Sequence, residues 1–179
     1  SMAPQQVDPC FERRRTKRGA PPWDLRSNTQ SFGPTFQQIK MTENLPPKLV
    51  QAFTETDYIV HHEPPFTMNI GKPCEELKKL MAKRKALGAA FITAWNPLSQ
   101  KLSAKQNDAR QQELKEILKK RGLTFFDGVG QHPSNKWHGE ASVLVLDLNR
   151  EAAKVLANHF EQHAFVWTDK TAVPKLVLP

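Results

Sequence analysis

The chain has 179 residues and a net charge of +8, and its 39% apolar and 25% charged residues are typical of a globular protein with one hydrophobic core. No stretch approaches the roughly 18 consecutive apolar residues of a membrane-spanning helix, and no signal peptide is recognisable. The two cysteines, Cys10 and Cys74, lie far apart without metal-ligand spacing, which is typical of a reducing compartment. We therefore expect a cytoplasmic protein with no membrane partner.

Residues 1–40 are predicted to form a basic, proline-rich arm that precedes a single domain of residues 41–179. The first two residues are typical of a tag remnant and are excluded from the fold. The arm carries seven Lys and Arg against three Asp and Glu, and its basic cluster includes Arg13, Arg14 and Arg15. The cluster indicates either a contact with nucleic acid or an acidic partner, or a leader without fixed structure.

The arm is expected to contribute little to folding. A chain starting at Met41 should keep its thermal midpoint within a few degrees, since about 1 kcal/mol moves the midpoint of such a domain by roughly 2–8 °C. Thermal unfolding of the two chains measures this. A much larger drop would show that the arm is an integral part of the fold.

The domain is predicted to begin with a short helix of residues 45–53 and a hairpin of two strands, 58–61 and 66–70. The second strand alternates apolar and polar residues, so we expect it near an edge of the sheet. A helix of residues 74–86 follows. Its outer face is basic and includes Lys78, Lys79 and Arg84.

The unbroken apolar run of residues 89–95 predicts a strand that is buried on both faces. Asn96 precedes a proline, so we expect an extended conformation there and a loop after the strand. Ser103 and Gln106 have the spacing of a capping box, which predicts a helix of residues 103–121. A strand, a polar loop and a helix N-terminus in this order form the crevice where α/β sheets usually bind ligands.

The rest of the chain is predicted to contain four more strands, one helix and a long polar loop. These are a strand of residues 123–126, the loop of 128–139, a strand of 141–148, a helix of 150–162 and strands of 164–167 and 174–178. Together the elements predict an α/β fold, with α+β as the alternative. The expected architecture is a mixed sheet of about six or seven strands with three main helices, in two or three layers.

Strand directions predict that polar residues from separate segments meet. A strand–helix–strand unit makes strands 89–95 and 123–126 parallel, so that their carboxyl ends lie at one edge of the sheet. The next strand returns from that edge and brings Glu140 to it. Asn107 lies on the inward stripe of its helix, one turn from the start. We therefore expect Asn96, Asn107 and Glu140 to lie within hydrogen-bonding reach of one another.

The same residues carry a resemblance to a known family. They are Phe91 to Pro97 with Ser99, then Asn107, Gly128 and Gly130, Trp137 with Glu140 and Ser142, and Gln162 with Ala164 and Val166. In this order they resemble a small bacterial family, the domain of unknown function family 3293, over about residues 53–178. The resemblance implies a compact bacterial α/β domain and supplies no activity. Asp147 departs from the family pattern, which has glycine there.

Glu140 is the candidate catalytic residue, for acid–base chemistry or charge recognition, because it enters a buried strand. The alternative is an ion pair with a nearby lysine or arginine. The candidate ligand-binding residues are Thr93, Trp95, Asn96, Ser99, Asn107, His132, Trp137 and Ser142. Their structural alternatives are a turn, packing and bonds to the loop backbone; for Asn107 a tie to the loop ranks first.

Two groups of histidine with glutamate offer nitrogen and oxygen atoms to a metal, but neither has the spacing of a known metal site. The groups are His61 and His62 with Glu63, and His132 and His138 with Glu140. We therefore expect no metal and no other cofactor. No motif for a phosphate-binding loop or for a nucleophilic serine or cysteine is present either.

Two classes of function remain open, and the sequence does not decide whether the protein is an enzyme. The first is a domain that binds a small polar or nucleotide-like ligand in a crevice formed by 93–99, 107 and 128–142. The second is an interaction module that binds nucleic acid or protein through the basic helix 74–86 and the arm. Its candidate contacts are Arg13, Arg14, Arg15, Lys78, Lys79 and Arg84.

The interaction module predicts affinity for DNA or RNA that falls steeply with added salt, because bound phosphates release counterions. Charge reversal at Lys78, Lys79 and Arg84 should abolish that affinity. Titration of a labelled oligonucleotide at low and high salt measures it. Absence of binding even at low salt contradicts this class of function.

Overall fold

The computed structural model of the protein describes residues 45–134 and 138–179, which lie within one compact unit. The predicted arm of residues 1–40 lies outside the described residues. The candidate site residues that lie outside them are Arg13, Arg14, Arg15 and Trp137, and their roles stay predictions.

The described residues form four α-helices and a seven-stranded sheet, so the α/β class is confirmed. The helices are α2 (Pro47–Glu55), α3 (Glu75–Arg84), α4 (Ala104–Lys120) and α5 (Arg150–His159), with a 3-10 turn η1 at Pro97–Ser99. The strands are β1 (Asp57–Val60), β2 (Phe66–Met68), β3 (Gly88–Ile92), β4 (Phe125–Gln131), β5 (Glu140–Leu146), β6 (Phe165–Asp169) and β7 (Lys175–Val177).

The strand order is β2-β1-β4-β5-β3-β6-β7, and every pairing is antiparallel. The expectation of a mixed sheet was therefore wrong. β3 and β4 do run in the same direction, as predicted, but β5 lies between them and pairs with both: Leu144 is opposite Phe91 on one side and Phe126 on the other. The chain returns directly from the end of β4 and fills the position that a parallel neighbour would take. The start of β5 thus lies at the carboxyl ends of both strands.

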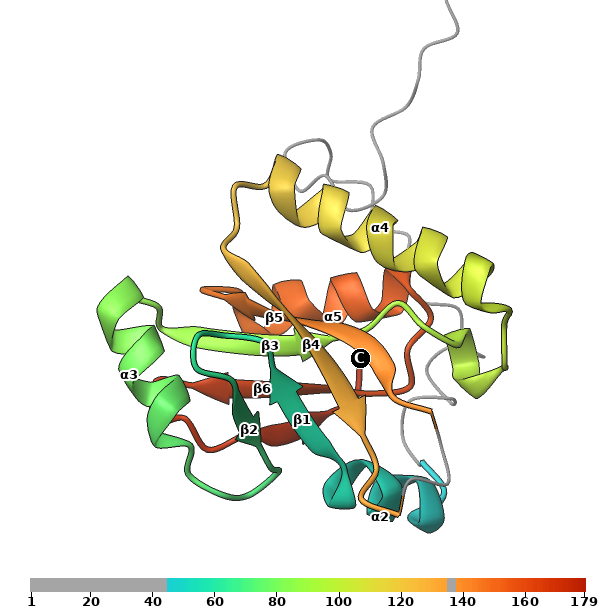
Figure 1. The fold of residues 1–179 in the computed structure, drawn as a ribbon, viewed down its shortest axis with the longest axis horizontal. Helices are drawn as coiled ribbons and strands as arrows, with labels where there is room; N and C mark the ends of the chain where they lie inside the picture. The colour runs from blue at the N-terminus through green and yellow to red at the C-terminus, as the bar shows by residue number, and fades with distance from the viewer. Residues whose placement is uncertain (1–44, 135–137) are drawn as a thin grey trace, which may run out of the picture. The chain divides into compact units, whose positions relative to one another are not determined.

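The core occupies both faces of the central strands. On one face, Phe91 and Leu144 pack in a cluster with Leu77 of α3. The alternating positions Ala90 and Val145 are buried too, which confirms the prediction of a strand covered on both sides. In Figure 1, α4 and α5 lie above the strands and α2 lies below them. As predicted, the second strand of the hairpin, β2, is at an edge of the sheet.

Local signals in the sequence explain several element ends. The capping box at the start of α4 is confirmed: Ser103 Oγ accepts from Gln106 N at 3.2 Å, and Gln106 Oε1 accepts from Ser103 N at 3.1 Å. Asp147, where the resemblance led us to expect glycine, has φ 58°, a conformation that glycine adopts at no steric cost. Its carboxylate accepts a hydrogen bond from Leu87 N at 3.2 Å, which offsets part of the steric cost of this conformation for aspartate.

Two local expectations were wrong. Asn96 is left-handed (φ 44°, ψ 66°) rather than extended; asparagine tolerates this region, and four hydrogen bonds hold it there. The predicted loop of 128–139 begins as strand, because β4 continues to Gln131. Its glycines concealed the strand from a propensity argument. At Gly128 an added Cβ would lie 2.9 Å from Phe91 Cε2, so the glycine leaves room for that ring.

Candidate ligand-binding site

The loop after β3 is fixed by three side chains, two from α4 and one from the segment after α5. Gln111 of α4 accepts from Ala94 N at 3.0 Å through Oε1, and Arg110 Nε donates to Ala94 O at 2.9 Å. Gln162, after α5, donates to Trp95 O at 2.9 Å. Peptide groups that leave a sheet must find new partners when they are buried. These contacts supply them, so much of the polar character of the region is structural.

Asn96, Asn107 and Glu140 form one hydrogen-bonded group, which confirms their predicted convergence. Asn107 Oδ1 accepts from Asn96 N at 2.8 Å, and Asn107 Nδ2 donates to Asn96 Oδ1 at 2.9 Å. Asn96 Nδ2 donates to Glu140 Oε1 at 2.8 Å. Asn107 is 2% exposed and ties down the loop, which was its first-ranked structural role.

The loop also contains an unusual run of backbone conformations. Asn96, Leu98 and Ser99 all have positive φ, at 44°, 50° and 59°. Residues other than glycine rarely adopt such angles, because each costs free energy on the order of 1–3 kcal/mol and persists only where surrounding contacts enforce it. Leu98 N donates to Glu161 O at 2.7 Å, which adds a further restraint. The chain therefore maintains a defined, strained turn beside Glu140.

The Glu140 carboxyl is half-buried and has no cationic partner among the described residues. Burial raises its pKa above the ordinary value of 4.5, and the hydrogen bond from Asn96 opposes that rise without cancelling it. Within the described part of the chain no group donates a hydrogen bond to Oε2. The predicted alternative, an ion pair with lysine or arginine, is thus not found there.

The raised pKa predicts how Glu140→Gln changes stability with pH. A carboxyl whose pKa is raised by folding contributes stability that is fully present below the unfolded-state pKa and is lost as pH rises through the folded pKa. Glutamine keeps an oxygen for Asn96 Nδ2 and carries no charge. The variant should therefore gain stability relative to wild type between about pH 4 and about pH 7.

Urea unfolding of both proteins at the two pH values measures the difference. The other titratable groups that line the pocket, His132, His138 and Tyr58, are common to both proteins and cancel in the comparison. A difference that is independent of pH would show that the Glu140 pKa is not raised.

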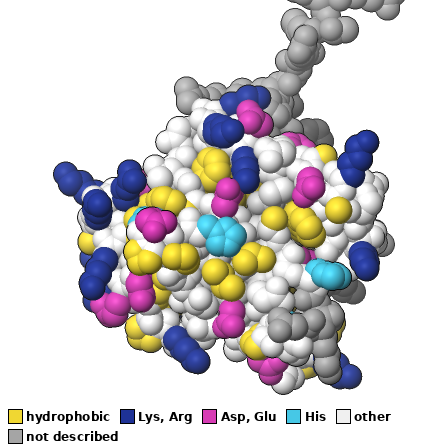
Figure 2. Space-filling view, viewed as in Figure 1, with side chains coloured by type: hydrophobic (Ala, Val, Ile, Leu, Met, Phe, Trp, Pro, Cys, Tyr) yellow, Lys and Arg dark blue, Asp and Glu magenta, His cyan; other side chains and the backbone are white. Residues whose placement is uncertain are grey.

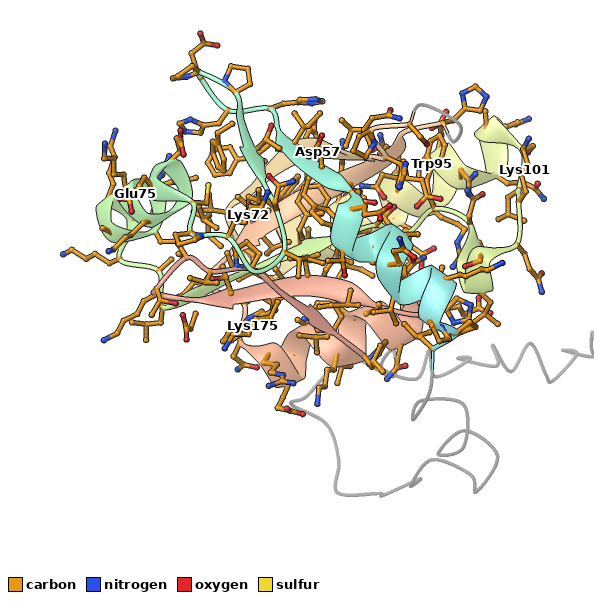
Figure 3. The ribbon with its side chains drawn as sticks, turned by 90° about the horizontal axis from the view of Figure 1, so that it is seen from below. Asp57, Lys72, Glu75, Trp95, Lys101 and Lys175 are labelled. Carbon is orange, nitrogen blue, oxygen red and sulfur yellow. The ribbon has the colours of Figure 1, made fainter. Side chains whose placement is uncertain are left out.

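A pocket of about 210 Å³ lies between α2 and the sheet. Figure 3 shows α2 crossing in front of the strands at this place. The wall from α2 is apolar, and the sheet contributes aromatic rings and small polar groups. The lining residues are Leu49, Ala52, Phe53, Thr56, Tyr58, Phe91, Thr93, Ser99, Gly130, His132, His138, Glu140, Ser142, Ala164, Phe165 and Val166.

α2 presents its apolar stripe to the pocket. Leu49, Ala52 and Phe53 have helical i, i+3, i+4 spacing, yet no residue of α2 is buried. The helix is attached to the sheet by Tyr58, whose hydroxyl donates to Phe53 O at 2.5 Å, and by the 3.1 Å contact of His132 Nε2 with Glu55 Oε2. An apolar stripe that faces a pocket instead of core side chains leaves space for another molecule.

The pocket contains some of the predicted site residues and not others. Thr93, Ser99, His132, Glu140 and Ser142 line it. The remaining described candidates, Trp95, Asn96 and Asn107, do not, and the last two act on the pocket through Glu140. Trp95 Nε1 is buried without an acceptor in the described part of the chain.

Several lining residues were missed from the sequence. Leu49 and Phe53 were predicted only as part of the helix of residues 45–53, and Tyr58 and Phe91 only as parts of strands. The signal that could have identified them is weak: a short amphipathic helix directly before an edge hairpin. His138 had been considered only as a metal ligand.

Two of the four histidines that were considered as metal ligands, His62 and His132, contact other side chains. His132 Nδ1 lies 2.7 Å from Ser134 Oγ, and the His62 ring packs edge-on against Phe126 at 5.1 Å. Among residues 45–134 and 138–179, no group of three or more His, Cys, Asp or Glu is arranged to hold a metal. Cys74 is buried at the N-cap of α3, and burial raises the pKa of its thiol.

The basic helix of the alternative function lies on another part of the surface. Lys78, Lys79 and Arg84 are exposed on α3, none of them lines the pocket, and two glutamates occupy the first turn of the helix. Figure 2 shows blue basic side chains along the left side, over α3, with magenta acidic side chains among them. The described part of this face is therefore mixed in charge.

Residues 92–165 match the family described as "Protein of unknown function (DUF3293)". This part of the chain is therefore similar to that family, which supports the resemblance seen in the sequence. This segment runs from the last residue of β3 to the first of β6, a shorter span than the predicted 53–178. It includes the group of Asn96, Asn107 and Glu140, whereas α2 precedes it. No curated protein and no solved structure matches the chain. No described helix of this protein has the length and apolar content to cross a bilayer.

Proposed function

We propose that this domain binds a small molecule with an apolar body and one polar end in the pocket between α2 and the sheet. The observation that carries the proposal is the pocket itself, about 210 Å³, with an apolar wall on α2 and the Glu140 carboxyl on the opposite wall. Pockets with mainly apolar walls and a few fixed polar groups are the usual form of small-molecule sites.

The size of the pocket limits the ligand. A cavity of about 150 Å³ lined by apolar side chains holds benzene, so about 210 Å³ accommodates one ring with a short side arm. Tyr58 and Phe91, in edge-to-face contact at 5.3 Å, provide aromatic surface for such a ring. A nucleotide fits less well, because no lysine or arginine in the described part of the chain lines the pocket to bind its phosphate.

The Asn96–Asn107 pair orients the Glu140 carboxyl, which would bind the polar end of the ligand. Asn96 Oδ1 accepts from both Leu102 N and Asn107 Nδ2, so its Nδ2 must be the end that faces Glu140. The carboxyl is thereby held in one orientation before any ligand arrives. Fixing a polar group in advance reduces the entropy lost on binding.

Filling the pocket tests the proposal. At Gly130 an added Cβ would lie 3.7 Å from the nearest atom, Thr56 Cγ2, so Gly130→Val places methyl groups in the pocket without a backbone clash. We expect 2-phenylethanol to shift amide resonances of Thr93, Gly130 and Ser142 in the wild-type protein. The shifts should be absent from Gly130→Val, whose thermal midpoint should stay within a few degrees of wild type.

The measurement is a two-dimensional amide NMR titration of both proteins. Leu87→Val, at an apolar position that is 74% exposed and does not line the pocket, is the matched control and should bind like wild type. Equal binding by wild type and Gly130→Val would contradict the proposal.

A further inference from the structure

We propose that the pocket selects ligands whose polar end is a primary ammonium group, with Glu140 as the acceptor that recognises it. This inference rests on the proposed function and specifies the chemical class of its ligand. The argument depends on which protons the pocket residues have already donated.

Four of the five hydroxyl groups that line the pocket donate their protons to backbone carbonyls; they are those of Thr56, Tyr58, Thr93 and Ser142. Thr93 Oγ1 donates to Ala141 O at 2.7 Å, and Ser142 Oγ donates to Glu140 O at 3.0 Å. The Tyr58 hydroxyl donates to Phe53 O at 2.5 Å, and burial raises the pKa of this phenol well above its usual range, so it keeps its proton. A hydroxyl has one proton and two lone pairs, so these groups offer only acceptors to a ligand.

Glu140 adds the strongest acceptor. Its Oε1 already accepts from Asn96, and no group among the described residues donates to Oε2. Among the described residues no lysine or arginine lines the pocket, so none of their side chains pairs with the carboxylate as a fixed cation. His132 is engaged with Glu55 and Ser134. A ligand with hydrogen-bond donors and a positive charge would donate to Oε2 and balance the charge of the carboxylate.

An ammonium group matches these acceptors better than the other common polar ends. It has three donors and no acceptor, as the lysine side chain does. A carboxylate or phosphate would place like charges together, and an alcohol would bring one donor without charge. A hydrogen bond to a charged group is worth about 1.5–3 kcal/mol for either donor, and only the ammonium group adds the attraction between opposite charges.

Three probes with the same ring separate these possibilities: 2-phenylethylamine, 2-phenylethanol and 3-phenylpropionate. At neutral pH the amine is protonated, as a lysine side chain is. We expect the wild-type protein to bind the amine about tenfold more tightly than the alcohol, and the acid least tightly. Glu140→Gln should remove the preference, so that the variant binds the amine no more tightly than the alcohol.

Glu151→Gln is the matched control for charge. Glu151 is on the surface of α5, with its side chain 81% exposed, and its replacement removes the same charge from the protein. It should retain the amine preference. Loss of the preference in both variants would assign it to overall charge and overturn the inference.

The outcomes separate the two proposals. Wild-type protein that binds the amine and the alcohol equally, or the acid most tightly, overturns ammonium selection and leaves the pocket as a binding site. Absence of binding by all three probes up to about 10 mM overturns the proposed function itself, because even a weak fragment of this size binds in the millimolar range. Binding of the alcohol by Glu140→Gln shows that this variant is folded, so its loss of amine affinity is interpretable.

Discussion

Asn107→Ala is expected to lower the free energy of unfolding by about 2–4 kcal/mol, which reduces the thermal midpoint by roughly 5–15 °C. Asn107 is 2% exposed and makes three hydrogen bonds, to Asn96 N, Asn96 Oδ1 and Leu102 O. Alanine leaves the Asn96 N–H without its partner and removes the restraint on a left-handed residue. The cost is therefore larger than that of one exposed hydrogen bond.

Urea or thermal unfolding measures this effect, with Asn158→Ala as the matched control. Asn158 is exposed on α5, and alanine is the better helix former there, so the control should match wild type or exceed it slightly. Equal stabilities for Asn107→Ala and the control would show that the 96–107 pair does not hold the loop.

Gly128→Ala is expected to destabilise the domain by about 2–3 kcal/mol, whereas Gly130→Ala should change stability by less than about 1 kcal/mol. Both glycines belong to β4 and lie opposite residues of β5, Ser142 and Glu140 respectively. At Gly128 an added Cβ would lie 2.5 Å from the Ile59 carbonyl oxygen and 2.9 Å from Phe91 Cε2, and the oxygen belongs to a paired strand.

Each of the two substitutions is the control for the other, since both add one methyl group to the same strand, two residues apart. At Gly130 the nearest atom to an added Cβ is 3.7 Å away, an ordinary contact. Urea unfolding of both variants gives the comparison. Equal losses of stability would contradict the close packing of Phe91 over Gly128 and the open space at Gly130.

Chain direction and local signals predicted a large part of the fold. The apolar run of β3, the capping box of α4 and the hairpin of β1 and β2 depend on short-range patterns that the sequence states directly. The meeting of Asn96, Asn107 and Glu140 followed from strand direction alone. This prediction was correct although β3 and β4 are not adjacent in the sheet. β5 begins at the carboxyl ends of both strands whether or not they are neighbours.

The pocket could not be predicted in the same way. Its apolar wall comes from α2, and the docking of a short helix onto a sheet depends on tertiary contacts such as Tyr58 to Phe53 and His132 to Glu55. β4 was predicted too short because its glycines have low strand propensity. Gly128 is explained only by the structure, in which the Phe91 ring packs where a side chain at 128 would be. The left-handed Asn96 likewise depends on partners that are distant in sequence.

The most direct test of the account is a crystal structure of the wild-type protein with 2-phenylethylamine bound. The account predicts that the ring lies between α2 and the sheet, against Phe53 and Phe91, in the pocket of about 210 Å³. The ammonium nitrogen should lie about 2.7–2.9 Å from Glu140 Oε2, as expected for a charged hydrogen bond. An empty pocket with the amine elsewhere on the surface would contradict the binding site. A ring in the pocket with the ammonium group directed away from Glu140 would contradict its selection by that residue.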